Sequence, residues 1–452
     1  MFEVFNIVLF LLGGISFTFF FYFASEAGKE NEPRAQSIAR ITALVSASFF
    51  LFSILMNDEY KFILMATLGA LSVILMILFF IPIGNVKVGN QKPKSRFDER
   101  DIMFARGRLQ PGSEEYKQYY QMRPENERSD ENTRSKPGLL SPQALYFNPY
   151  HNPAPISSFN LTHTMKPMVA GKPHPNRMLF KLEDATKYIK GMTSFFGALH
   201  VGITKLEPYH VYSHIGRGSG DYGAEIPIEH KYAVAFTVEM SHEMLANAPL
   251  SATVMESAKQ YVEVGRVAVQ LAEAIRALGY PARAHIDGDY RVICPLVARD
   301  AGLGELGRMG LLMTPTHGPR VRIGIVTTDL PLIPNEYTPD PSVIDFCNLC
   351  MKCAENCPSK SISFEPREEY DETLRWRINP DSCYKYWYVI GTDCGICMRV
   401  CPYSHPATLS HNIIRWGISR SGLFRRFALW LDNLFYGKYP SPKDPPDWAK
   451  LG

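Results

Sequence analysis

The sequence of 452 residues has no marked excess of charge of either sign. Its 48 basic and 45 acidic residues leave a formal net charge of +3. A protein that binds nucleic acid through the phosphate backbone needs a concentrated cationic surface, which this balance does not supply. The charge balance therefore argues against nucleic acid as a partner.

Cysteine is almost missing from the first three quarters of the chain, where only Cys294 occurs. The other eight cysteines lie between Cys347 and Cys401. Disulfide frameworks belong to small secreted domains, so eight cysteines crowded into one segment of a long chain favour metal ligation. We expect Cys294, in the apolar sequence RVICPLVARD, to be a buried small hydrophobic side chain.

Charged side chains are absent from three apolar segments, residues 5–24, 41–56 and 62–83. About twenty helical residues cover the roughly 30 Å hydrocarbon layer of a bilayer. We therefore predict three transmembrane helices in an anchor of residues 1–84. A cleaved signal peptide is the alternative for the first segment, although it lacks a basic start.

Basic residues flank the predicted spans mainly on one side of the membrane. That side holds Lys29, Arg34, Arg40, Lys87, Lys92, Lys94 and Arg96, and the other side holds Lys61. The positive-inside bias predicts a multi-pass inner-membrane protein, in contact with lipid, whose soluble part faces the cytoplasm. No twin-arginine motif precedes the first span, in agreement with this orientation.

Residues 85–155 are rich in Pro, Glu, Arg and Asn, as in RPENERSDENTRSKPG. Such a composition buries too little apolar surface to fold alone, so we predict a linker that wraps over the next domain. At the other end of the chain, residues 411–452 form a predicted amphipathic tail. Aromatic and basic residues alternate over 421–440, which predicts a helix lying on the membrane surface or packed on the catalytic domain.

Residues 156–340 carry strand and helix patterns that predict an α+β domain. Strands are expected at 233–240 and 321–330, with a long helix over 251–278 that ends at Gly279. Two glycine-bearing stretches, AGLGELGRMG and THGPRVR, match neither a P-loop nor a dinucleotide fingerprint. Such glycines either let the backbone approach a bulky cofactor or form ordinary turns. Under the first interpretation the cofactor-binding residues are Gly302, Gly304, Gly307 and Gly318.

A ferredoxin motif occupies the segment 341–410. Cys347, Cys350, Cys353, Cys357 and Pro358 form the C-x2-C-x2-C-x3-C-P run of bacterial ferredoxins. Its end recurs as Cys394, Cys397, Cys401 and Pro402, and the remaining ligand, Cys383, comes from an expected long loop. The segment is therefore predicted to be a bacterial-ferredoxin-like domain with two [4Fe-4S] clusters.

In such ferredoxins the last cysteine of each run binds the cluster of the other run. One predicted ligand set is Cys347, Cys350, Cys353 and Cys401; the other is Cys357, Cys383, Cys394 and Cys397. Two zinc sites would also use four thiolates each, but zinc ribbons need neither the third cysteine of each run nor the prolines.

Six segments between Leu278 and Pro406 carry a family resemblance. They are LGYPARA, AGLGELGRMGLLMTP, HGPRVRIGIVTTDLPL, FCNLCMKCAENCPSKSI, INPDSCYKYW and TDCGICMRVCPYSHP. In this order and spacing the chain resembles the reductive dehalogenases, cobalamin-dependent iron-sulfur enzymes that reduce organohalides. The resemblance extends back to about residue 156 and excludes the N-terminal spans, where respiratory members usually carry a twin-arginine signal.

The resemblance implies a nitroreductase-like domain that encloses base-off cobalamin, with the clusters feeding electrons to cobalt and a proton replacing the halide. In this family a helical tyrosine donates the proton beside a cation that stabilises its phenolate. The matching residues are Tyr261 and Arg320, with Asp287 where the family often has asparagine. Arg308 and Arg322 are alternatives to Arg320.

The electron donor implied by the resemblance is a quinol-linked membrane partner or a soluble ferredoxin, and the identity of the organohalide does not follow from the sequence. Two other functions fit parts of the pattern. One is that of epoxyqueuosine reductase, a related cobalamin enzyme that acts on tRNA; the other is that of a membrane electron-transfer protein without catalysis of its own. A bound corrinoid would separate the cobalamin enzymes from the electron carrier.

Overall fold

The computed structural model describes residues 2–81 and 86–451, which fall into two compact units. One unit combines the N-terminal helices with residues 406–441, and the other combines residues 87–405 with 442–452. The predicted C-terminal tail is thus divided between the units. The end of the third predicted span, residues 82–83, and the boundary at residue 84 lie outside the described residues.

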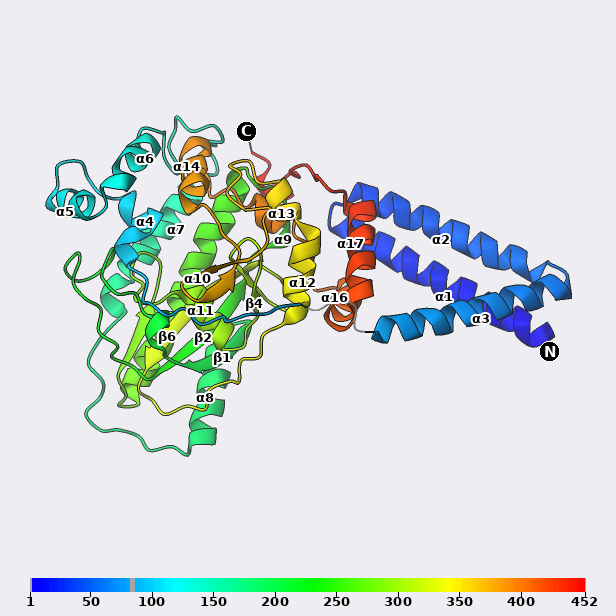
Figure 1. Cartoon of the computed structure of the whole chain (residues 1–452), viewed down its shortest axis with the longest axis horizontal. Helices are drawn as coiled ribbons and strands as arrows, with labels where there is room; N and C mark the ends of the chain where they lie inside the picture. Colours follow the sequence, from blue (N-terminus) through cyan, green and yellow to red (C-terminus); the bar gives the residue numbers. More distant parts are fainter. Residues whose placement is uncertain (1, 82–85, 452) are drawn as a thin grey trace. The chain divides into compact units, whose positions relative to one another are not determined.

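The first unit contains three helices long and apolar enough to cross a membrane (Figure 1). These are α1 (Phe2–Lys29), α2 (Pro33–Ile54) and α3 (Asp58–Phe80). Most of their apolar side chains are exposed, which suits a lipid environment rather than water. The same unit also contains α16 (Leu409–Arg420) and α17 (Gly422–Tyr436).

Helix α17 packs on the apolar helices of its own unit. The ring of Phe435 lies edge-on to Phe23 of α1 at 5.1 Å, and Phe424 lies 5.8 Å from Phe79 of α3. Its outer face exposes Phe427 and Trp430. The helix is amphipathic, and it packs on the predicted spans rather than on the catalytic domain.

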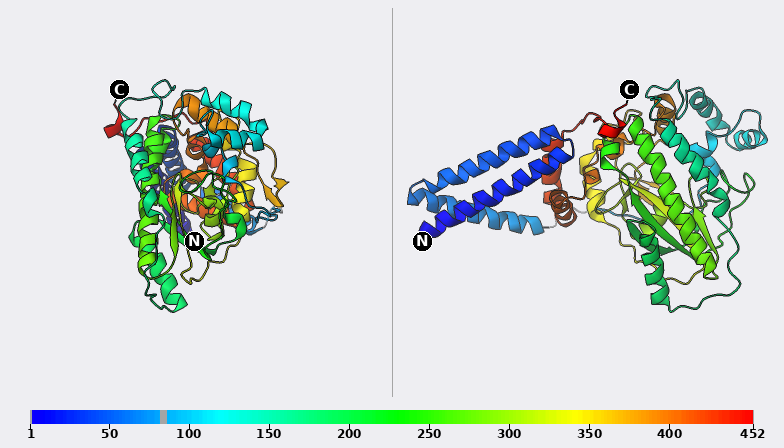
Figure 2. Two further views of the ribbon diagram at one scale, coloured as in Figure 1. Left: turned by 90° about the vertical axis from the view of Figure 1, so that its left-hand side faces the viewer. Right: turned by 180° about the vertical axis from the view of Figure 1, so that it is seen from behind.

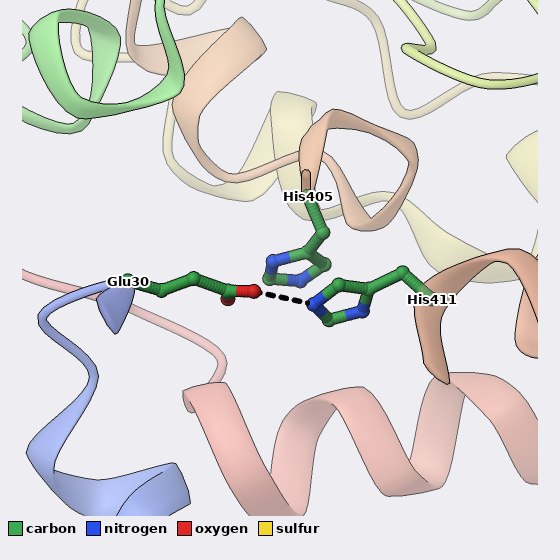
Figure 3. A group of neighbouring side chains, drawn as sticks. All are labelled: Glu30, His405 and His411. Atoms are coloured by element: carbon green, nitrogen blue, oxygen red, sulfur yellow. Dashed lines mark hydrogen bonds and ion pairs between the residues drawn. The ribbon is translucent and has the colours of Figure 1, made fainter. Parts of the chain in front are cut away.

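A buried polar pair joins α16 to the turn between α1 and α2 (Figure 3). His411 Nε2 lies 3.0 Å from Glu30 Oε1, and the hydroxyl of Tyr436 lies 3.4 Å from the same nitrogen. Burial makes such a pair costly to break because each group would lose its partner without regaining water. The pair therefore fixes α16 and α17 at the end of α1.

The second unit is built on a four-stranded antiparallel sheet with the order β1-β2-β6-β3. The strands are β1 (His200–Lys205), β2 (Tyr232–Glu239), β3 (Ala282–His285) and β6 (Val321–Thr328). Alternate residues of a strand face opposite sides of a sheet. Accordingly, Val234 and Phe236 join one apolar core, and Ala233 and Ala235 join another.

Helix α10 (Ser251–Ala277) runs along one face of this sheet (Figure 2). It shares its core with α8 (Leu182–Phe195), whereas α11 (Cys294–Asp300) contributes to the core on the other face. The predicted strands and long helix are therefore present in the expected α+β domain. Gly279 follows α10 with φ of +87°, the left-handed geometry that commonly terminates a helix.

The predicted linker folds into short helices. They are α4 (Met103–Arg106), α5 (Glu114–Met122) and α6 (Pro124–Arg134), and α7 (Pro153–Thr164) begins at its end. Helices α4 and α6 contact α14 (Pro380–Ile390) of the cysteine-rich segment, whereas α7 packs on α10. The amide of Tyr146 donates to the Ile390 carbonyl at 2.9 Å, and buried Arg106 pairs with Asp130 and Asp381. Polar and aromatic contacts with its neighbours thus supply the stability that the composition of this segment lacks on its own.

The cysteine-rich segment combines short helices with one two-stranded hairpin. It contains α12 (Pro341–Cys350), α13 (Lys352–Glu355), β7 (Glu368–Tyr370), β8 (Thr373–Arg375), α14 (Pro380–Ile390) and α15 (Ile396–Arg399). The expected long loop around Cys383 is in fact α14. Its boundaries have local causes, since Asn379 caps its start, Pro380 occupies the first turn and Gly391 ends it with positive φ.

The remaining elements of the second unit are short. They are α9 (His242–Ala246), β4 (Glu305–Leu306), β5 (Leu312–Met313), and the 3-10 helices η1 (Glu99–Asp101), η2 (Lys166–Met168), η3 (Pro208–His210), η4 (Pro402–Ser404) and η5 (Asp447–Ala449).

Candidate functional site

The first group of cysteines gathers around the break between α12 and α13. Cys347 and Cys350 lie in the last turn of α12, and Cys353 lies in α13. Met351 between them has φ of 53°, a left-handed residue that turns the chain back on itself. Cys401, far along the chain, completes the group: burial, followed by the thiols of this group, raises the pKa of Cys401 well above its usual value.

The second group combines Cys357 with cysteines from α14 and α15. Burial and then the thiol of Cys357 raise the pKa of Cys383 to about 11. Burial, followed by the nearby thiols of Cys394 and Cys383, raises the pKa of Cys397 well above its usual value. The structure thus brings together, in each group, the four cysteines that the ferredoxin crossover predicts.

The sulfur atoms in these groups are spaced more widely than a single zinc ion requires. Among the described residues, no three cysteine sulfurs lie within 4.8 Å of one another. Zinc with four thiolates at about 2.3 Å holds its sulfurs about 3.8 Å apart. The donors are all sulfur, and their spacing leaves room for a larger cluster, so they fit iron-sulfur clusters better than zinc.

Tyr261 lies on α10 and faces β6. The Nη1 of Arg322 donates to the Tyr261 hydroxyl at 3.2 Å, and its guanidinium carbon lies 4.2 Å from the centroid of the ring. Ser257, one turn earlier on the same helix face, accepts from Nη2 of Arg322 at 2.5 Å. Arg322 is therefore held by two groups of one helix, with its charge directly at the phenol.

Arg320, the first choice among the arginines, has other partners, and the alternative Arg322 occupies the place at the phenol. The Nη1 of Arg320 pairs with Glu239 at 2.6 Å, and its Nε donates to the Ser404 carbonyl at 2.8 Å. Arg320 precedes β6 at the point where Val321 pairs with Glu239. Arg308, the other alternative, donates from Nε to the Cys347 carbonyl at 3.1 Å and lies beside the first cysteine group.

The electrostatic surroundings keep the Tyr261 hydroxyl protonated. Burial raises the pKa of Tyr261, the positive charge of Arg322 acts against this increase, and the negative charge of Asp287 adds to it. Tyr261 and Asp287 nevertheless keep part of their surface accessible. Side chains that are deeply surrounded yet partly accessible are expected to face a space inside the protein.

Two further groups of this site were not found from the sequence. Burial raises the pKa of the Asp393 carboxyl. The Ser257 hydroxyl and the charge of Arg322 act against this increase. Burial raises the pKa of Tyr290 well above its usual value, and the neighbouring groups Cys294 and Tyr261 add to this effect. The spacing of four residues between Ser257 and Tyr261 could have identified the serine; no sequence signal identifies Tyr290.

The predicted cofactor-binding glycines mostly pack against the protein itself. A Cβ on Gly304 would lie 2.2 Å from the Met313 carbonyl oxygen, and one on Gly318 would lie 2.4 Å from Cβ of Tyr403. A Cβ on Gly307 would lie 2.9 Å from Cγ of Met313 and 3.5 Å from the sulfur of Cys347, and the nearest atom to one on Gly302 would be Cβ of Asn335 at 3.8 Å. Close packing therefore accounts for glycine at 304 and 318.

Cys294 is also less isolated than expected. It begins α11 and is partly accessible, and burial raises the pKa of its thiol to about 12. The Cys294 thiol raises the pKa of Tyr290, and the positive charge of Arg217 lowers the pKa of Cys294. Cys294 therefore stands near the tyrosine site and apart from both cysteine groups.

Comparisons with known proteins agree with this geometry. Residues 346–405 match the 4Fe-4S dicluster domain family. The chain is 30% identical over 289 residues to the tetrachloroethene reductive dehalogenase of Sulfurospirillum multivorans, a match that covers 56% of this chain and 57% of that protein.

Two solved structures share the fold. The catabolic reductive dehalogenase NpRdhA, in complex with 3-bromo-4-hydroxybenzoic acid, matches with a TM-score of 0.63 and 25% identity over 79% of this chain and 48% of its own. A reductive dehalogenase described as suggesting a mechanism for B12-dependent dehalogenation matches with a TM-score of 0.59 and 27% identity over 69% of this chain and 46% of its own.

The chain thus spans about half the length of the relatives it matches, 57% of the curated protein and 48% of the NpRdhA chain. Within that span the likeness includes both the sequence and the arrangement of sheet, helices and cysteines. Over about half of their length, the chain is therefore similar to the reductive dehalogenases in sequence and in fold, and it carries a matching dicluster domain.

Proposed function

We propose that the chain is a membrane-anchored reductive dehalogenase. The net reaction consumes one proton and two electrons, breaks a carbon–halogen bond, forms a carbon–hydrogen bond and releases halide. The observation that carries this proposal is the contact between Arg322 and the hydroxyl of Tyr261, which lies in the same unit as the two cysteine groups.

Tyr261 is the proposed proton donor. Burial raises its pKa, so the hydroxyl holds its proton at neutral pH until the substrate demands it. Once the proton leaves Oη, the guanidinium of Arg322 stabilises the phenolate that remains. Asp287 adds negative charge nearby and thereby favours the protonated phenol.

A bound corrinoid would supply a low-valent cobalt that passes electrons to the carbon–halogen bond. The accessible surface of Tyr261 and Asp287, in a deeply surrounded part of the unit, fits groups that face such a cofactor. Gly302 and Gly307 remain proposed contacts with it, and the base-off state remains an expectation from the family. Gly304 and Gly318 are explained more simply by the backbone packing around them.

The eight cysteines are the proposed ligands of two [4Fe-4S] clusters. Cys347, Cys350, Cys353 and Cys401 would hold one; Cys357, Cys383, Cys394 and Cys397 would hold the other. Each cluster carries one electron at a time, so two successive transfers supply the two electrons of the reaction. Asp393 precedes Cys394 and reaches Arg322 through Ser257, which brings the second cluster close to the proton donor.

Helices α1, α2 and α3 are the proposed anchor in the inner membrane, with the catalytic unit in the cytoplasm. The basic residues of the flanking segments support this orientation. Helix α17, whose outer face exposes Phe427 and Trp430, is proposed to lie along the membrane surface. The electron donor is then a quinol-linked membrane partner or a soluble ferredoxin.

Both alternative functions are less well supported, since the match to epoxyqueuosine reductase covers only 24% of this chain. A carrier that only transfers electrons has no use for a buried tyrosine paired with an arginine. The balanced charge of the chain lacks the cationic surface that a tRNA substrate of the epoxyqueuosine type requires.

The decisive experiment measures halide release. Full-length protein, purified anaerobically and reconstituted with iron, sulfide and cobalamin, should release halide from organohalides in the presence of a low-potential donor. Corrinoid and iron contents are determined on the same sample, with Tyr261→Phe as the matched control. A protein that binds two iron-sulfur clusters and no corrinoid after reconstitution would overturn the proposal.

A further inference from the structure

Two cationic side chains converge on the turn that follows Asp287. A Cβ built on Gly288 would lie 3.1 Å from Nζ of Lys166 and 3.4 Å from Nη1 of Arg108, so both charged atoms lie within 3.4 Å of one point. Lys166 begins η2, and Arg108 follows α4, so elements far apart in the chain bring these charges together. Gly288 itself has φ of +72°, which favours glycine at this position.

This pair of cations has no anionic partner of its own. Within the described part of the chain, neither side chain forms a hydrogen bond or an ion pair. Burial and the charge of Arg108 lower the pKa of Lys166, although Asp287 and Asp289 act in the opposite direction. Lys166 is half-buried and Arg108 is exposed, so the two like charges repel each other without a counterion in contact, and water screens part of this repulsion.

The other charged groups of this region are already paired. Arg217 pairs with the buried carboxylate of Glu99 at 3.2 Å. Asp289 accepts from Arg283 at 2.8 Å and lies 3.5 Å from Arg291. Asp287 remains as the nearby carboxylate, and its charge acts on both Lys166 and Tyr261. Asp287 alone does not balance the two positive charges of Lys166 and Arg108, so this region has an excess of positive charge.

The cation pair also lies near the proton donor. Asp287 precedes Gly288 in the chain and influences the pKa of Tyr261, after burial and Arg322. The guanidinium of Arg217, which opposes protonation of Lys166, lies 6.0 Å from the ring of Tyr290, a neighbour of Tyr261. An anionic group held by Lys166 and Arg108 could thus belong to a molecule whose other end reaches Tyr261.

We propose that Lys166 and Arg108 form an anion subsite that binds a carboxylate or phenolate of the substrate. This inference rests on the proposed dehalogenase function and narrows its substrate class to aromatic organohalides with a negative charge, rather than neutral haloalkenes. Arg108 offers a fork of N–H donors, and Lys166 adds a point charge, so one oxyanion satisfies both. Binding relieves the repulsion between the two cations.

The test compares a charged substrate with a neutral one of similar shape. In steady-state assays of the reconstituted protein, 3-bromo-4-hydroxybenzoate is compared with methyl 3-bromo-4-methoxybenzoate. We expect Lys166→Gln and Arg108→Gln each to raise KM for the charged substrate about tenfold, the effect of one lost charge contact. The value of kcat, and both constants for the neutral substrate, should change little.

The matched control is Lys172→Gln, because Lys172 is an exposed lysine of the same segment. It should leave all constants unchanged. Equal losses for the charged and neutral substrates, or an unchanged KM for the charged one in both variants, would overturn the inference. Weaker product inhibition by bromide, with KM for the charged substrate unchanged, would instead assign the subsite to the released halide and reject a substrate contact.

A binding measurement separates this inference from the proposed function. Isothermal titration of the same protein with 4-hydroxybenzoate, which has no halogen, should show binding that Lys166→Gln weakens about tenfold. If the wild-type protein releases no halide from any substrate, the proposed function fails while this binding result still stands. If halide is released but titration detects no Lys166-dependent binding, the subsite alone is rejected.

Discussion

The cysteine groups and the tyrosine site differ in how their residues are distributed along the chain. Seven of the eight proposed cysteine ligands come from two short runs, whose spacings of two and three residues match the ferredoxin motif, and only Cys383 lies outside them. The tyrosine site combines α10, β6 and the turn after β3, whose proximity depends on the pairing of the sheet. The spacing of nearby residues can be observed directly in a sequence. A contact between distant residues depends on how the strands pair, and a single sequence does not reveal that pairing.

The largest expected effect is the loss of one cluster in Cys397→Ala. Removing one of four thiolates should reduce the iron content from about eight to about four atoms per chain. Halide release should fall to background because electrons no longer cross the second cluster. Iron analysis and low-temperature EPR of the reduced protein measure the change. Cys294→Ala is the control and should retain all of its iron; a comparable loss there would contradict the assignment of the eight ligands.

The next largest effect is expected at the proton donor. Tyr261→Phe removes the hydroxyl that Arg322 contacts, and halide release should fall about a hundredfold to ten-thousandfold, the usual range for loss of a general acid. Iron and corrinoid contents should remain unchanged, which distinguishes this loss from misfolding. Tyr290→Phe, a neighbouring phenol, should reduce the rate far less. A small effect of Tyr261→Phe with a large effect of Tyr290→Phe would assign the proton to the other tyrosine.

Some elements of the fold could be predicted from the sequence, and others could not. The strands β2 and β6 and helix α10 follow from apolar periodicity and were located to within two residues. The apolar runs predicted three helices at the N-terminus, although α2 begins eight residues before the run that predicted it. The short helices of residues 103–134 were missed because their stability comes from contacts such as Arg106 with Asp130 and Asp381, which composition does not reveal. Helix α14 was missed although Asn379, Pro380 and Gly391 mark its ends in the sequence.

The arginine beside Tyr261 illustrates the limit most clearly. Arg320 and Arg322 are two residues apart, and a motif alone does not distinguish them. The pairing of Val321 with Glu239 directs Arg320 to that carboxylate and leaves Arg322 opposite α10. The distinction depends on a long-range strand register, which is the kind of information that is missing from a single sequence.

Separate substitutions of Arg320 and Arg322 by glutamine test which arginine acts on Tyr261. Arg322 lowers the pKa of Tyr261, so Arg322→Gln should raise that pKa further and move the alkaline limb of the pH–rate profile to higher pH. The rate at neutral pH should fall about tenfold to a hundredfold, because the phenolate loses its charge-assisted hydrogen bond. The pH dependence of halide release provides the measurement.

Arg320→Gln should leave the alkaline limb in place. It breaks the contacts of a buried guanidinium with Glu239 and with the Ser404 carbonyl, so a lower thermal midpoint is expected, equivalent to about 2 kcal/mol given that Glu239 is half exposed. If Arg320→Gln moved the limb and Arg322→Gln did not, the pairing of Arg322 with Tyr261 would be refuted.

The smallest expected effect belongs to Asp287→Asn, which introduces the residue that the family often carries at this position. The negative charge of Asp287 raises the pKa of Tyr261, so its removal should move the alkaline limb of the pH–rate profile to lower pH, opposite to the shift in Arg322→Gln. Below that limb the phenol stays protonated, and the rate at neutral pH should change by less than about threefold, the effect of one partly screened charge. Asp221→Asn, an exposed carboxylate, provides the control and should leave the profile unchanged. A shift of the limb to higher pH would contradict the inference that the negative charge of Asp287 raises the pKa of Tyr261.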